Sequence, residues 1–348
     1  MQQTEIKRKA TKSSRAVNCC MADGTPDGSR GDSPRRPLFG IGQVINDRWI
    51  ITGRIGEGSF GTVYKAKSKQ FGIEVAVKAE RADSKQRSLE VDVVLLSKLN
   101  GSRHTCTLYS YGTIGQVHYL VMDLMGRTLS EIKQSGSRKT FSWNTSLRIA
   151  IQCVEAVEEV HSIGYLHRDI KPDNLAIDVD EATARTIYLL DFGLARRYVT
   201  LNGEIRKPRQ SPGFRGTTLY SSVTANKGKE AGRVDDLWSV MYSIIECMQG
   251  ALPWDHVNEK DIVSIKENMS NQLLLENAPE EMEYVLNYLK SMKYEEQPHY
   301  KWIISLFEAI MQEHEYQHDD PYDWQIPFLK KKESLQKQKK PDSVCIQA

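Results

Sequence analysis

The stretch "GYLHRDIKPDN", residues 164–174, concentrates charged and amide side chains between two apolar runs of the chain. Transfer of a phosphoryl group requires a residue that accepts the proton of the attacking hydroxyl, a cation near the moving phosphate, and ligands for magnesium. Asp169, Lys171 and Asn174 have these three chemistries and lie within one loop. The stretch therefore indicates a phosphoryl-transfer site and sets what the rest of the chain must provide.

A second acidic motif lies further along the chain. "YLLDFGL", residues 188–194, ends an apolar strand pattern with Asp191 and continues into a turn at Gly193. Mg²⁺ prefers hard oxygen ligands. The oxygens of Asn174 and Asp191, together with phosphate oxygens and water, match that preference, so we predict that these two residues bind the metal.

A glycine-rich motif precedes both. "RIGEGSFGTVYKAK", residues 54–67, has Gly56, Gly58 and Gly61 in the G-x-G-x-x-G spacing that lets backbone N–H groups approach phosphate. A dinucleotide-binding loop would continue into a helix, whereas two strand patterns follow here, which argues against an oxidoreductase. The motif favours a hairpin lid over phosphates, and an ordinary hairpin turn is the alternative.

The second of these strands ends in "VAVK", residues 75–78. The two-residue period of a strand places Ala76 and Lys78 on one face, where the small side chain leaves room for a flat ring. In the helical stretch that follows, Glu90 shares a face with Val93 and Val94, and a carboxylate there is costly unless a cation pairs with it. We therefore predict an ion pair between Lys78 and Glu90.

The hydrophobic pattern divides the chain. Residues 49–124 are dominated by strand patterns, and helical patterns dominate after Gly126, with strong helices expected at 143–162 and 234–250. Residues 1–40 have too few apolar side chains to offset the entropy of ordering and are expected to be flexible. The lysine-rich run "KKKESLQKQKK" near the end is also expected to be disordered.

The four motifs "GEGSFG", "VAVK", "HRDIKPDN" and "DFG" occur in the order and spacing of a eukaryotic protein kinase, and the resemblance covers about residues 46–320. It implies an α+β, bilobal protein kinase fold. The implied parts are a disordered basic tail at 1–40, a small β-rich N-lobe at 46–122, a hinge and larger helical C-lobe at 123–325, and a lysine-rich tail at 326–348.

The resemblance also implies the chemistry. Because Lys171 lies two residues after Asp169, the chain resembles the serine/threonine type, which uses ATP and Mg²⁺ to phosphorylate hydroxyls of protein substrates. The implied catalytic residues are Asp169, Lys171, Lys78 and Glu90. The implied ATP-binding residues are Ile55, Gly56, Glu57, Gly58, Ser59, Phe60, Gly61, Val63, Ala76, Lys78, Met122, Asp123 and Met125. For Met122 and Met125, plain core filling is an overlapping alternative.

Finer features resemble the casein kinase 1 group, and within it the tau-tubulin kinase branch. The usual A-P-E tripeptide is absent, "SSVTAN" stands in its place, and Trp238 gives the form D-D-L-W-S. By this resemblance Asp236 braces the catalytic loop and Thr217 contacts Asp169, although an acidic pair at a helix N-terminus is also favourable by itself. Leu219 stands where the group commonly has arginine. The basic stretch "RKPRQSPGFR" nearby favours acidic substrates or is a solvated loop.

The alternative function is a pseudokinase scaffold that binds partners without catalysis. Such a protein usually lacks at least one catalytic side chain, whereas here the set is complete: Lys78, Glu90, Asp169, Asn174 and Asp191. We therefore expect an active enzyme. The resembled group is generally active without phosphorylation of its activation segment, and the same is expected here.

Charge and composition limit partners and location. The chain carries +2 overall, and each end has four excess positive charges, in residues 1–40 and 330–348, which leaves −6 for the middle. This argues against a dedicated nucleic-acid binder. Six irregularly spaced cysteines, no apolar run of membrane-spanning length and no signal peptide predict a soluble, intracellular protein. We expect it to be cytoplasmic and monomeric. Nuclear import through residues 6–15 and prenylation at Cys345 are alternatives.

Overall fold

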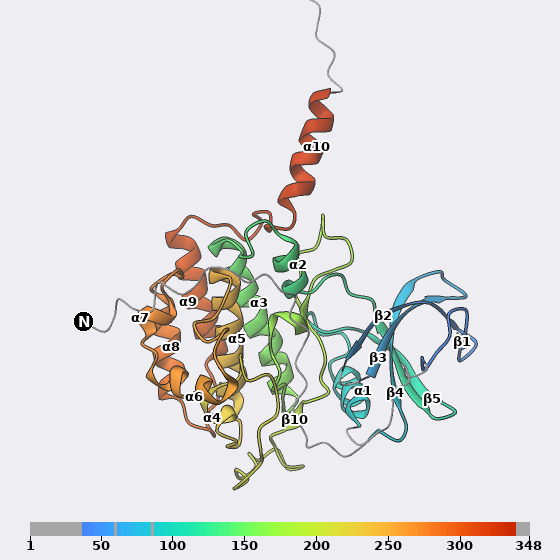
Figure 1. Ribbon diagram of the computed structural model, residues 1–348, viewed down its shortest axis with the longest axis horizontal. Coiled ribbons are helices and arrows are strands. Elements are labelled where there is room, and N and C mark those ends of the chain that lie inside the picture. The colour runs from blue at the N-terminus through green and yellow to red at the C-terminus, as the bar shows by residue number, and fades with distance from the viewer. Residues whose placement is uncertain (1–36, 59–60, 85–86, 339–348) are drawn as a thin grey trace, which may run out of the picture. The chain divides into compact units, whose positions relative to one another are not determined.

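The computed structural model describes residues 37–58, 61–84 and 87–338. The first part of this range forms a six-stranded antiparallel sheet in the order β1-β2-β3-β4-β6-β5, with one helix, α1, packed against it (Figure 1). The bounds are β1 Val44–Ile45, β2 Trp49–Gly58, β3 Gly61–Ser68, β4 Glu74–Arg81, α1 Ser88–Lys98, β5 Leu108–Ile114 and β6 Val117–Asp123. This is the expected β-rich N-lobe.

The glycine-rich motif forms a hairpin between β2 and β3, in which Gly58 pairs with Gly61. Gly61 has φ of 125°, and a Cβ atom there would lie 2.3 Å from the carbonyl oxygen of Ala79 on the neighbouring strand. No other residue type fits that position without moving the backbone. Residues 59 and 60 lie outside the described part of the chain, and so do the predictions for Ser59 and Phe60.

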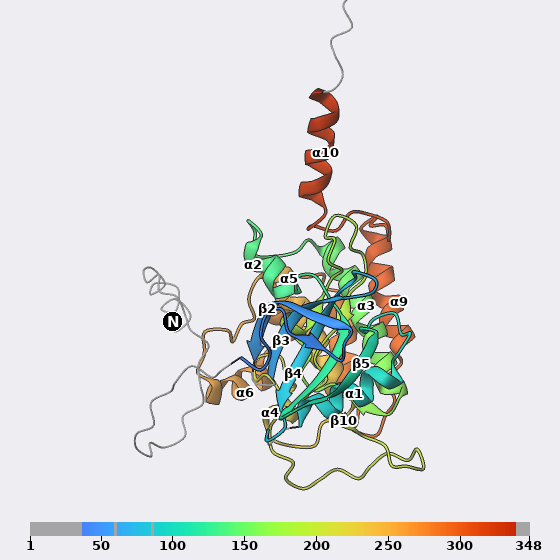
Figure 2. The same cartoon turned by 90° about the vertical axis from the view of Figure 1, so that its right-hand side faces the viewer.

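Helices form the second part, and the two strongest sequence patterns are confirmed. α3 (Trp143–Ser162) is capped by Ser142, whose hydroxyl accepts the backbone N–H of Thr145. α5 (Arg233–Gln249) is buried along nearly its whole length. Turned by 90° (Figure 2), the strands β2 to β5 lie in front of these helices. The other helices are α2 Leu129–Ser135, α4 Val223–Asn226, α6 Glu259–Asn268, α7 Asn271–Leu274, α8 Met282–Ser291, α9 Tyr300–Glu313 and α10 Ile326–Gln338.

Short elements between α3 and α5 carry the polar motifs. They are β7 Tyr165–Leu166, the 3₁₀ helix η2 Pro172–Asn174, β8 Leu175–Ala176, β9 Tyr188–Leu189 and β10 Arg196–Arg197. The largest buried core continues from Leu95 and Leu120 of the N-lobe to Leu129 and Leu147 of the helical C-lobe. The α+β, bilobal fold is thus confirmed, and its shared core fixes the motif loops against the sheet.

The lysine-rich end differs from expectation. Its predicted disorder is wrong for residues 330–338, which belong to α10 (Ile326–Gln338). Lysine, glutamine, glutamate and leucine have good helix propensity, so a run of them continues as a helix. The tail predicted at 1–40 lies outside the described part except for residues 37–40, and residues 339–348, including Cys345, also lie outside it. Among the residues that the structure describes, no helix has the length and apolarity needed to cross a membrane.

Candidate active site

A cavity of about 420 Å³ lies where the glycine-rich hairpin, the end of β6 and the two acidic motifs meet. Its walls combine apolar side chains with convergent polar groups, the usual composition of a small-molecule site. Gly61 begins β3 directly after the turn and does not line the cavity. The predicted ATP-binding residues that do line it are Ile55, Gly56, Glu57, Gly58, Val63, Ala76, Lys78, Met122, Asp123 and Met125.

Other residues that line the cavity belong to none of the sequence motifs that predicted the site. Leu96 of α1, Cys106 before β5 and Leu189 of β9 contribute apolar surface from three elements far apart in the chain. Burial raises the pKa of the Cys106 thiol to about 12, so this sulfur is a neutral wall group. Their place in the site follows from packing, which a linear motif does not encode.

Lys78 is buried between two carboxylates. Its Nζ donates to Asp92 Oδ2 at 2.7 Å and to Asp191 Oδ1 at 2.9 Å. Burial opposes the charge, but the two acids outweigh it and raise the pKa of Lys78 above its usual value. The same ion pair lowers the pKa of Asp191 against the effect of burial. Lys78 is therefore a fixed positive charge at the inner end of the cavity.

The predicted ion pair between Lys78 and Glu90 is wrong, because Asp92 occupies that position. The Glu90 side chain is 58% exposed and lies 3.9 Å from Arg87. Two residues along a helix correspond to a rotation of about 200°, so Glu90 and Asp92 face opposite sides. The buried face of α1 contains Leu89, Asp92 and Leu96, and this i, i+3, i+7 stripe was readable in the sequence.

Asp92 makes a further contact that links three elements. While its Oδ2 accepts from Lys78 of β4, its Oδ1 accepts the backbone N–H of Phe192 at 2.8 Å. Phe192 belongs to the turn that follows Asp191. One buried side chain of α1 therefore ties the position of Lys78 to the position of the acidic turn.

Residues 167–174, which we call the catalytic loop, bring together the side chains that the sequence predicted to act there. Asp169 is buried, its Oδ1 accepts from the hydroxyl of Thr217 at 2.7 Å, and its Oδ2 lies 3.0 Å from Lys171 Nζ. Lys171 also donates to the Thr217 hydroxyl at 2.8 Å. The amide nitrogen of Asn174 donates to the Asp169 carbonyl at 2.8 Å. A carboxylate, an ammonium and an amide thus lie within one hydrogen-bonded group.

Asp236 supports this loop from the N-terminal end of α5. Its carboxylate accepts the backbone N–H groups of His167 at 2.7 Å and of Arg168 at 2.8 Å, and it accepts from His161 Nε2 at 2.9 Å. Arg168 has φ of 69°, a left-handed conformation that is uncommon for a residue with a side chain. The buried carboxylate holds that conformation and thereby aims Asp169.

The oxygens of Asn174 and Asp191 suit a hard divalent cation. Asn174 uses its amide nitrogen to hold the loop, and within the described part of the chain nothing donates to its Oδ1. Asp191 uses Oδ1 for Lys78 and for the N–H of Gly193, and no described donor meets its Oδ2. Both residues line the cavity. These two available oxygen atoms in one cavity are suitable ligands for Mg²⁺.

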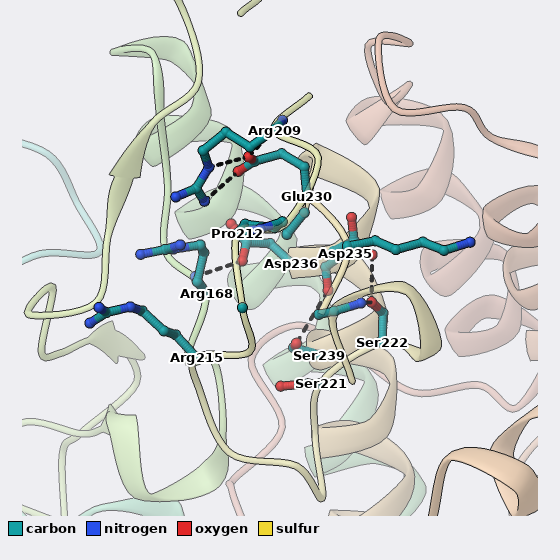
Figure 3. A pocket seen from close by; sticks show the side chains of 14 residues that line it. Arg168, Arg209, Pro212, Arg215, Ser221, Ser222, Glu230, Asp235, Asp236 and Ser239 are labelled. Carbon is teal, nitrogen blue, oxygen red and sulfur yellow. Dashed lines mark hydrogen bonds and ion pairs between the residues drawn. The ribbon is translucent and has the colours of Figure 1, made fainter. Parts of the chain in front are cut away.

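A basic pocket lies beside the catalytic loop. Glu230 pairs with Arg196 and Arg209, which leaves Arg168 and Arg215 without a carboxylate partner among the residues described. Burial and the neighbouring arginines lower the pKa of Arg168 to about 10, so it stays charged at neutral pH. Figure 3 shows Arg209 bonded to Glu230, with Arg168 and Arg215 extending in one direction. The pocket carries net positive charge.

Comparisons with known proteins show which family and which relatives the chain is similar to. A family model described as the protein kinase domain matches residues 49–317. A protein of Dictyostelium discoideum named as a serine/threonine-protein kinase is 35% identical over 83% of this chain, which spans 58% of that relative's length. Two proteins of Caenorhabditis elegans carry the same description. One is 34% identical over 85% of this chain and 87% of its own length, and the other, spe-6, is 32% identical over 81% and 77%.

Proposed function

The chain belongs to the protein kinase family, and we propose that it transfers the γ-phosphoryl group of ATP to serine and threonine hydroxyls of protein substrates. The family is that of protein kinases, and three relatives of the chain are named as serine/threonine-protein kinases, which supports the same activity for this chain. One observation carries the proposed mechanism. Lys78 and Asp191 line the same cavity, and Asp169 lies in the loop that adjoins it through Asn174. Nothing favours the pseudokinase alternative.

In the proposed reaction the substrate hydroxyl approaches Asp169. As its oxygen bonds to the γ-phosphorus, the proton passes to the Asp169 carboxylate, and the bond from phosphorus to the bridging oxygen of ADP breaks. Lys171, 3.0 Å from Asp169, places positive charge beside the transferring group. Lys78 orients the phosphates, and Asn174 and Asp191 would hold the metal. When bound, Mg²⁺ neutralises charge that develops on the phosphate oxygens.

The experiment that tests this mechanism replaces Asp169 by asparagine. Purified Asp169→Asn protein, given labelled ATP, magnesium and a generic acidic protein substrate, is expected to lose several powers of ten in kcat, because the proton acceptor is gone. ATP binding, measured by titration, is expected to persist, since Asp169 does not line the ATP cavity. Wild-type activity in the variant would contradict the role assigned to Asp169.

Within the family we place the chain in the casein kinase 1 group, closest to the tau-tubulin kinase branch. The support is the "SSVTAN" segment in place of A-P-E and the D-D-L-W-S form at Trp238. Asp236 and Thr217 make the contacts that this resemblance implied. Leu219 remains a departure, so phosphate-primed substrates are not part of the proposal.

The proposed substrates are acidic. Arg168, which directly precedes Asp169, and Arg215 line the basic pocket and have no carboxylate partner among the residues described. A substrate with carboxylates near its acceptor hydroxyl would meet them. We further propose a monomeric, cytoplasmic or nuclear protein. Because the catalytic loop is already held by Asp236 and Thr217, activity is expected without prior phosphorylation.

A further inference from the structure

A buried lysine of α6 lies under the loop that begins at Thr217. Lys266 is 7% exposed, and its Nζ donates to the carbonyl oxygens of Thr218 at 2.8 Å and Ser221 at 2.6 Å, and to Asn226 Oδ1 at 3.1 Å. An ammonium has three N–H donors, and here each meets one acceptor. Within the described ranges, Lys266 makes no ion pair with a carboxylate.

Keeping a charge at this place is costly. Burial lowers the pKa of Lys266 to about 7, because removing an ammonium from water disfavours its charged form. Two aromatic faces offset part of that cost, since the Lys266 nitrogen lies 4.8 Å from the ring centre of Tyr242 and 5.0 Å from that of Trp254. The site is therefore built around a cation that bonds to main-chain oxygens.

These bonds act on one segment, residues 217–222, which we name the substrate loop. Trp254 Nε1 donates to the carbonyl oxygen of Leu219 at 2.9 Å. Together, Lys266 and Trp254 bond the carbonyls of Thr218, Leu219 and Ser221. The loop is thus fixed through its backbone from one side.

The other side of the substrate loop touches the reacting centre. Thr217, its first residue, donates to Asp169 Oδ1 at 2.7 Å and accepts from Lys171 at 2.8 Å. A peptide whose hydroxyl reaches Asp169 must pass beside this loop. By contrast, no residue of the loop, and neither Lys266 nor Trp254, lines the ATP cavity.

We propose that Lys266 is a positioning residue for the reaction, which fixes the substrate loop through the carbonyls of Thr218 and Ser221 so that a protein substrate can present its hydroxyl to Asp169. This inference rests on the proposed kinase function. It separates two properties of the enzyme, because loss of Lys266 disturbs the protein-substrate side and leaves the nucleotide side intact.

The test compares Lys266→Met with Lys266→Arg, using Lys260→Met as the matched control, since Lys260 is an exposed lysine of the same helix. For Lys266→Met we expect kcat/KM for the protein substrate to fall at least about tenfold while KM for ATP stays within about twofold. Arginine, which keeps the charge and its donors, is expected to restore most of the activity. The control is expected to match wild type.

Hydrogen exchange tests the anchor without using activity. The amides of Tyr220 and Ser221 donate to the Thr217 carbonyl, so their exchange rates report the order of the substrate loop. We expect faster exchange there in Lys266→Met, and a smaller increase in Trp254→Phe, which keeps an aromatic ring and removes the N–H donor to Leu219. Unchanged exchange and unchanged kcat/KM in Lys266→Met would overturn the inference. An inactive wild type would instead refute the kinase function, and the exchange result would still decide whether Lys266 is the anchor.

Discussion

Lys78 is held by two carboxylates that have different roles. Asp191 is 28% exposed at its side chain and has one oxygen available to the cavity, so it is suited to bind the metal. Asp92 is buried and has both oxygens occupied, by Lys78 and by the amide of Phe192. It therefore contacts neither nucleotide phosphate nor metal in the proposed reaction, and acts by positioning the groups that do.

Replacing Asp92 by asparagine tests this role at the residue scale. Removing one member of a buried ion pair typically destabilises a protein by about 3–5 kcal/mol. Because Lys78 would still pair with Asp191, we expect the loss of unfolding free energy to lie near or below the lower end of that range. We expect kcat/KM to fall at least about tenfold and the melting temperature to decrease.

Glu90→Gln is the control on the same helix. Its side chain is exposed, and substitutions at such places usually change stability by less than about 0.5 kcal/mol. Rates are measured with purified proteins and stability by thermal unfolding. A larger loss in Glu90→Gln than in Asp92→Asn would restore the pairing that the helix pattern predicted and reject the one in the structure.

At the scale of elements, two features of the C-lobe frame the reaction. The N-terminus of α5 presents Asp236 to the catalytic loop, and the segment after β10 supplies Arg209 and Arg215 of the basic pocket. Glu230 pairs with both Arg196 and Arg209 and offsets one of their two positive charges, and these contacts lower the pKa of Glu230 against the effect of burial. Only part of the positive charge in the "RKPRQSPGFR" stretch is therefore offset. Among the described residues Arg206, Lys207 and Arg215 have no carboxylate partner, and of these Arg215 lines the basic pocket.

Arg215→Gln tests the preference for acidic substrates. A charge pair near the surface contributes about 0.5–1 kcal/mol, so we expect KM for an acidic peptide to rise about two- to fivefold. KM for a neutral peptide with the same acceptor is expected to stay unchanged. Arg138→Gln, an exposed arginine elsewhere in the C-lobe, serves as the control. An equal effect on both peptides would remove Arg215 from substrate selection.

At the scale of the whole molecule, the cavity exists because two lobes meet. The sheet contributes Lys78 and the glycine-rich hairpin, and the C-lobe contributes Asn174 and Asp191. A ligand held by both lobes stabilises the folded state by mass action, about 2.7 kcal/mol at a hundred times its Kd. ATP with magnesium should therefore stabilise the protein against unfolding.

We expect saturating ATP and Mg²⁺ to raise the melting temperature by several degrees, as such a free energy does for a domain of this size. Removing the metal with a chelator should reduce the shift, because Asn174 and Asp191 would then offer no bridge to the phosphates. Lys78→Met should reduce it as well. A wild-type shift that is independent of magnesium would contradict the assigned metal ligands.

Several parts of the fold and site were predictable because their signals are local. The strand alternation before Gly126, the helical stripe at 143–162 and the loop with Asp169, Lys171 and Asn174 each depend on residues close together in the chain. The helix at 326–338 was missed, because a run of polar residues has no hydrophobic periodicity that would show whether it is ordered.

The sequence by itself determined which chemical groups this kinase has and in which loops they lie, since each motif is contiguous. Only the tertiary structure decided which acid meets Lys78, because Asp92 and Asp191 are 14 and 113 residues away from it and the choice depends on how α1 faces the sheet. Likewise, packing decides that Glu230 pairs with Arg196 and Arg209 and that Lys266 bonds to the carbonyls of Thr218 and Ser221. Such pairings join separate elements, and their geometry arises only when the lobes share a core.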